Sequence, residues 1–177
     1  MGELLHRIRT ISFVLFIISA IVTPIKLFGQ GKFSVSGGFS LPELINGGIL
    51  YQIKQSQVGL NIGFYPKYSY KYIPLTANYY YHFAGSSKFS TLRPWYGKSG
   101  LMYLVDEDQY ILDKSLYFPL LVGRNFNMSN HFGLNLEIGL AFLLYSDRTI
   151  KEYHEYPYGP AEVGSTPSGG FSFFYRF

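Results

Sequence analysis

Apolar and polar residues alternate along most of the chain with a period of two. Side chains on a β-strand point to opposite faces in turn, so this alternation predicts strands that have one apolar and one polar face. The clearest case is the segment 132–144, where every even-numbered residue is apolar and the odd-numbered residues include Asn135 and Glu137. This segment is therefore predicted to be one long amphipathic strand.

The same alternation predicts eight strands and no helix after residue 30. In the first strand the odd-numbered residues from Phe33 to Leu41 form the apolar face, and the fifth strand has the weakest pattern. The predicted strands span residues 33–41, 49–53, 58–64, 73–83, 95–105, 116–122, 132–144 and 171–177. Eight consecutive amphipathic strands indicate an all-β barrel or sandwich.

The composition of the polar face distinguishes between a soluble barrel and a membrane barrel. A soluble barrel turns its apolar face inward, whereas a membrane barrel turns it toward lipid and keeps small and polar groups inside. The second face here is rich in glycine and carries few charges, and the apolar face of 132–144 exceeds the roughly 9–11 residues that cross an outer membrane. We predict a closed eight-stranded antiparallel transmembrane up-and-down β-barrel, with a soluble exported ligand-binding barrel as the alternative.

The first thirty residues are predicted to be a signal peptide, followed by the barrel in residues 31–177. Arg7 and Arg9 precede the apolar run 11–22, which Pro24 and Lys26 then end. A basic start and a short apolar run are typical of a signal peptide, and a membrane-spanning helix needs about 20 apolar residues. Cleavage is expected within 27–30. A retained N-terminal anchor is the alternative.

Composition excludes several classes of protein. Of the 177 residues, 15% are charged and 19% are aromatic, and there are 19 glycines and no cysteine. This composition rules out a disordered chain, a disulfide framework and a thiolate metal site. The formal charge of +4 is too small to indicate nucleic acid as a partner, and no cofactor is expected.

The connections also divide into two groups if the chain enters the barrel from the periplasm. The predicted outer connections are 42–46, 65–72, 106–115 and 146–168, and the inner ones are 54–57, 84–93 and 127–131. Short inner turns and long outer loops are typical of membrane barrels, although 84–93 is longer than expected. Nine of the ten acidic residues after residue 30 lie in the outer connections or at their edges: Glu43, Asp106, Glu107, Asp108, Asp113, Asp147, Glu152, Glu155 and Glu162.

Four segments carry a resemblance to a known family. IPLTANYYYHF, RPWYGKSGLMY, PLLVGRNF and the closing FSFFYRF resemble segments of the small outer-membrane β-barrel proteins of Gram-negative bacteria. The resemblance covers Lys32 to Phe177. It implies a location in the cell outer membrane, contact with outer-membrane lipid, and recognition of the last strand, ending at Phe177, by the barrel-assembly machinery.

No residues combine into a convincing catalytic or metal site. His82, His131 and His154 have no metal-ligand spacing, so we predict no metal and no catalytic residue. Ser146, Asp147 and His154 are candidates for a lipid-modifying hydrolase, but no spacing orients a base on the serine. An outer-membrane lipid-modifying enzyme remains the alternative to a protein without catalytic activity.

Barrel size limits the remaining functions. Eight strands enclose a space that side chains fill, whereas open channels need about 16 strands. We therefore predict a structural or surface-binding protein with a filled lumen. The longest outer connection supplies the candidate surface-binding residues, and its extracellular partner is not specified: Tyr153, His154, Glu155, Tyr156 and Tyr158.

Glu137 is expected to form an ion pair inside the lumen. Its odd position places it on the inward face of its strand, where an unpaired carboxylate would cost several kcal/mol. Lys98 and Arg176 lie on the predicted inward faces of their own strands and are the candidate partners, with Lys98 slightly favoured because Arg176 lies near the chain end. Arg124 lies on the predicted lipid-facing side of its strand. The pair is expected to stabilise the barrel, with a gated path or proton site as the alternative.

Overall fold

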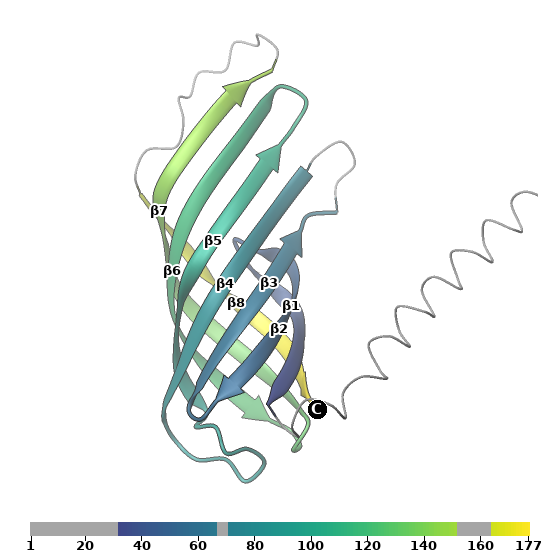
Figure 1. The fold of residues 1–177 in the computed structure, drawn as a ribbon, viewed down its shortest axis with the longest axis vertical. Helices are drawn as coiled ribbons and strands as arrows, with labels where there is room; N and C mark the ends of the chain where they lie inside the picture. The colour runs from purple at the N-terminus through teal and green to yellow at the C-terminus, as the bar shows by residue number, and fades with distance from the viewer. Residues whose placement is uncertain (1–31, 67–70, 152–163) are drawn as a thin grey trace, which may run out of the picture.

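The computed structural model (Figure 1) describes residues 32–66, 71–151 and 164–177, and these form eight antiparallel strands closed into a barrel. Each strand pairs with its neighbour in sequence, and β1 pairs with β8. The strands are β1 (Phe33–Leu41), β2 (Leu44–Ile53), β3 (Ser56–Phe64), β4 (Lys71–Ala84), β5 (Trp95–Glu107), β6 (Ile111–Asn127), β7 (Phe132–Ile150) and β8 (Ser165–Arg176). The predicted closed antiparallel barrel is confirmed. The predicted signal peptide lies outside the described residues.

The apolar faces of the strands point outward. On β7, Ile138 is 77% exposed while Asn135 is 9% exposed, and on β1 Phe39 is exposed whereas the next residue along the strand, Ser40, is less so. The face assignment that the sequence predicts is confirmed for β1, β7 and the weakly patterned β5. We call the outward-facing exposed residues of the barrel wall the apolar belt; examples are Ile49, Leu60, Leu75, Leu101, Leu120, Ile138 and Phe173.

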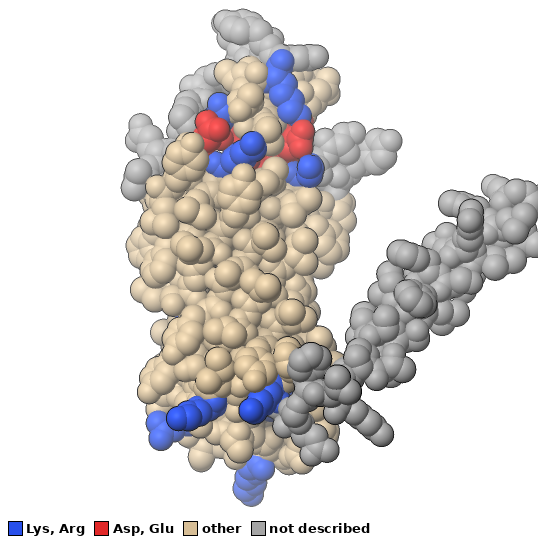
Figure 2. All heavy atoms as spheres, in the orientation of Figure 1, with Lys and Arg blue, Asp and Glu red and all other residues tan. Residues whose placement is uncertain are grey.

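Charged side chains avoid the apolar belt. On the side shown in Figure 2, the middle of the barrel carries neither acids nor bases, and both signs gather at the end where β5 to β7 extend furthest. At the opposite end the described residues in this view show only Lys and Arg. The wall therefore has an apolar middle and two charged rims.

Three strands are longer than predicted and form an extension beyond the barrel. The predicted outer connections 106–115 and 146–168 were too long, because β5 runs to Glu107, β6 starts at Ile111 and β7 runs to Ile150. We call residues 106–107, 111–115 and 145–150 the outer extension. Its ladder pairs charged residues across the strands, with Asp113 opposite Arg148. Hydrophobic alternation cannot detect strands that are held together by charge pairs.

The first hairpin also corrects a prediction. β2 begins at Leu44, so the predicted outer connection 42–46 is only a two-residue turn, Pro42 and Glu43. Glu43 is 6% exposed instead of lying at the outer surface, and its Oε2 accepts a hydrogen bond from Ser40 Oγ at 3.2 Å. Gly47 and Gly48 interrupt the hydrophobic pattern there, which concealed the start of the strand.

The long inner connection folds back over the barrel end. Gln55, in the β2–β3 turn, donates from Nε2 to the Thr91 carbonyl at 2.8 Å and accepts from the Arg93 backbone N–H at 3.1 Å. His82 Nδ1 lies 2.6 Å from the Arg93 carbonyl oxygen, and Leu92 is 1% exposed. Residues 85–94 are therefore a fixed cover and not a free loop.

No helix among the described residues is both long and apolar enough to cross a membrane.

Candidate functional site

The centre of the lumen holds a buried ion pair. Lys98 Nζ on β5 lies 2.9 Å from Glu137 Oε2 on β7, and the two side chains are 7% and 10% exposed. Lys98 also lies over the Tyr80 ring, 5.6 Å from its centroid. The contact expected between Glu137 and Lys98 is thus present in the structure.

A glycine allows a tyrosine to complete the pair. Tyr96, Gly123 and Glu137 are directly in register across β5, β6 and β7. Tyr96 Oη donates to Glu137 Oε1 at 2.8 Å, and a Cβ at position 123 would lie 2.5 Å from the Tyr96 ring. Only glycine on β6 leaves the tyrosine room to cross the intervening strand. The hydrophobic pattern does not single out Tyr96, because its contact with Glu137 depends on the register of three strands and not on which face it occupies.

Glu43 enters the same region from the first hairpin. It borders two small cavities of about 20 and 10 Å³ that Lys98 and Glu137 also line. A cavity needs roughly 10–15 Å³ to hold one water molecule, so no open path surrounds the pair in the described part of the lumen. The arrangement is a closed plug in which one lysine lies near two carboxylates.

The other two cations considered for Glu137 lie elsewhere. Arg124 points outward, with its guanidinium carbon 5.2 Å from the centroid of the Trp95 ring and 4.9 Å from that of Phe126. Arg176, the less favoured candidate, lies away from Glu137, because it pairs in the ladder with Ser34 near the inner end of β8. Glu137 instead lies opposite Gly170 on that strand. Arg176 therefore lies six positions along β8 from the residue opposite Glu137.

The outer extension carries a second set of ion pairs. Arg148 Nη2 lies 2.6 Å from Asp113 Oδ2, and Arg148 Nε donates to Asp113 Oδ1 at 2.7 Å. Lys151 Nζ lies 2.6 Å from Glu107 Oε1, and Lys71 lies 3.5 Å from Glu107 Oε2. The hydrogen bond and then the charge of Lys151 lower the pKa of Glu107 below its ordinary value. The Glu107 pairs are the more exposed and the Asp113–Arg148 pair is partly buried, so each is expected to add little stability.

The candidate hydrolase residues do not form a catalytic arrangement within the described residues. Ser146 Oγ lies 3.4 Å from Ser115 Oγ, and the exposed Asp147 is its neighbour on a strand whose side chains alternate between faces. His154 lies outside the described residues, as do Tyr153, Glu155, Tyr156 and Tyr158. The part of the chain that the structure describes contains no cluster of three or more potential metal-ligating side chains.

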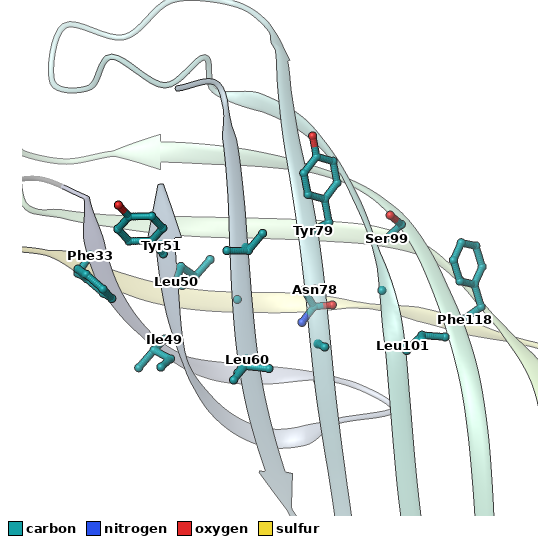
Figure 3. Close-up of a pocket in the computed structure, with 14 residues that line it drawn as sticks. Phe33, Ile49, Leu50, Tyr51, Leu60, Asn78, Tyr79, Ser99, Leu101 and Phe118 are labelled. Atoms are coloured by element: carbon teal, nitrogen blue, oxygen red, sulfur yellow. The ribbon is translucent and has the colours of Figure 1, made fainter. Parts of the chain in front are cut away.

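A shallow depression crosses the outward-facing wall over β1 to β6 (Figure 3). It has a volume of about 690 Å³, and its rim includes Ile49, Tyr79, Leu101 and Phe118. Small outward-facing residues such as Ala77 form part of its floor. The depression belongs to the apolar belt and offers no charged group to a ligand.

Comparison with known proteins identifies the fold. No family model matches the chain, and no curated protein matches it. A solved structure, the N-terminal β-barrel domain of Pseudomonas aeruginosa OprF, matches with a TM-score of 0.56 over 84% of this chain and 98% of that chain. This chain has the same eight-stranded barrel fold. At 15% sequence identity the likeness to OprF extends to the fold alone.

Proposed function

We propose that the protein is an integral outer-membrane β-barrel that acts as a structural or surface-binding protein through its outer loops. The observation that carries this proposal is the apolar belt around a closed barrel with a polar interior. Soluble proteins rarely leave so much contiguous apolar surface in water, and lipid is the solvent that suits it. The fold shared with the OprF barrel, a domain of an outer-membrane protein, supports the same location.

The differences between the two rims of the barrel support one orientation of the protein in the membrane. The inner connections are short or folded back, as in the β2–β3 turn and residues 85–94, while the outer extension projects beyond the belt. Aromatic side chains that suit a membrane interface lie near the inner rim, including Trp95 and Tyr175. In this orientation the outer extension, which ends just before the predicted surface-binding residues, faces the cell exterior, and the strand ending at Phe177 is available to the barrel-assembly machinery.

The filled lumen favours a role that does not require solutes or ions to pass through the barrel. The Lys98–Glu137 pair and its tyrosines leave cavities only about the size of one water molecule. We therefore attribute any activity to the outer surface. A lipid-modifying enzyme is the first alternative, and an activity assay on lipid A distinguishes it. A soluble ligand-binding barrel is the second, and it would remain in solution without detergent after the signal is removed.

Deleting Tyr153 to Glu162 tests the surface-binding role. Tyrosines provide large contact area at low entropic cost, so we expect the deletion to abolish binding of cells to an extracellular ligand or surface while the barrel still assembles. The measurement compares cell adhesion and the heat-modifiable migration of the folded barrel on gels. The control replaces Gln109 and Tyr110, which lie in the short turn between β5 and β6, by glycine. Loss of adhesion in the control alone would contradict the assignment to 152–163.

A further inference from the structure

We propose that the inner opening of the barrel contains a binding site for a phosphate group, held by the guanidinium of Arg176. The site lies between the cover formed by residues 85–94 and the last residues of β8. It is distinct from the lumen plug and from the outer surface, and its geometry does not depend on which end of the barrel faces the periplasm.

Arg176 is buried and has no counter-ion among the described residues. The residue is 6% exposed, and its Nη1 is buried with no hydrogen-bond partner in that part of the chain. Its guanidinium carbon lies 4.3 Å from the centroid of the Phe174 ring, which orients the group without neutralising it. Burying an unpaired cation is costly, so such a group is expected to meet an anion.

A cavity opens beside Arg176. Its volume is about 510 Å³, and Arg176 lines it together with Ser90, Thr91, Asn130 and His131. Hydroxyl, amide and imidazole groups are the donors that surround oxyanions in proteins. His131 is held in place because its Nδ1 lies 2.9 Å from the Arg176 carbonyl oxygen. The opening thus combines a cation with other hydrogen-bonding side chains, in a space large enough for a phosphate group.

The surrounding charge favours an anion as well. None of the seven acidic side chains among the described residues lies in the inner connections or at the inner strand ends. Those regions carry five bases besides Arg176: Lys32, Lys54, Lys88, Arg93 and Arg124. A guanidinium presents paired N–H groups that match two phosphate oxygens, which is why a phosphate group fits better than a halide.

Titration of the folded protein with inorganic phosphate tests the site. The protein is held in dodecyl maltoside, which contains no phosphate, at constant ionic strength, and binding is followed by calorimetry and by the NMR signal of the Arg176 Nε–H. We expect saturable binding at one site. R176Q should weaken it by about tenfold or more, because a charge-assisted paired hydrogen bond is lost, and R176K should weaken it less.

R124Q is the matched control, because it removes one cation from the same end at an exposed position. It should leave phosphate affinity nearly unchanged. A second arm adds phosphatidylglycerol to the micelles and counts retained lipid by native mass spectrometry, which distinguishes a lipid headgroup from a free phosphate. Binding in either arm that R176Q abolishes and R124Q retains supports the proposal. No binding in both arms, or equal losses in R176Q and R124Q, would overturn it.

Discussion

Replacing Ile138 by arginine is expected to lower the free energy of unfolding of the barrel in lipid by about 2–4 kcal/mol, the cost of an arginine near the middle of a membrane. Ile138 is the most exposed large apolar residue of the described chain, at 77%, and lies about midway along the belt-facing part of β7. Urea titration followed by the fluorescence of Trp95, the single tryptophan, measures the change. Leu136→Arg is expected to behave similarly.

Two controls distinguish this effect from a general intolerance of substitution. Thr149→Arg places the same side chain at an exposed position of the outer extension, where a change within about 0.5 kcal/mol is expected. Asn135→Ser, on the inward face, keeps a polar group in the lumen and should be mild. A soluble barrel would tolerate arginine at position 138 as well as at 149. Equal stability of these two arginine variants would therefore contradict the lipid-facing assignment.

The second large effect is expected at the lumen pair. Glu137→Ala should reduce the free energy of unfolding by about 3–5 kcal/mol, because it leaves Lys98 buried and removes the acceptor of the Tyr96 hydroxyl. Adding Lys98→Met to Glu137→Ala should recover part of this loss, since no cation then remains unpaired. The same urea titration on the two single variants and the double variant gives the coupling energy.

Asp113→Ala is the matched control for the ion pair. The Asp113–Arg148 pair is only partly buried, so this variant should lose less free energy of unfolding than Glu137→Ala.

Glu43 adds a further test. It borders the same cavities as Lys98, so Lys98→Met alone leaves two carboxylates without that lysine and should be at least as damaging as Glu137→Ala. If the effects of Glu137→Ala and Lys98→Met simply added, the pair would have no stabilising role.

The sequence predicted the barrel well because alternation along a strand reports directly which face is apolar. All eight strands and the outward positions of β1, β5 and β7 followed from that rule. The alternation also admitted Lys98 and excluded Arg124, because one side chain points into the lumen and the other points outward. These inferences needed only local sequence and the length of the strands.

The features that escaped prediction depend on register or on polar pairing. Tyr96 reaches Glu137 because Gly123 lies between them in the ladder, and no local pattern gives that alignment. The outer extension is held by cross-strand charges, and a bulge between Leu116 and Tyr117 shifts its register relative to the barrel below. The alternation alone left Arg176 as a second candidate for Glu137, and only its position near the end of β8 separates the two groups.

Cysteine labelling in the membrane tests the central claim most directly, because the chain contains no cysteine that would give background. Single variants Asp147→Cys, Ile138→Cys and Lys54→Cys place thiols on the outer extension, the apolar belt and the inner turn, all at exposed positions. Intact cells are treated with a membrane-impermeant maleimide. We expect labelling at position 147 in intact cells, at position 54 only after the outer membrane is opened, and at position 138 only after unfolding. Labelling at position 138 as rapid as at position 147 would contradict a lipid-facing belt.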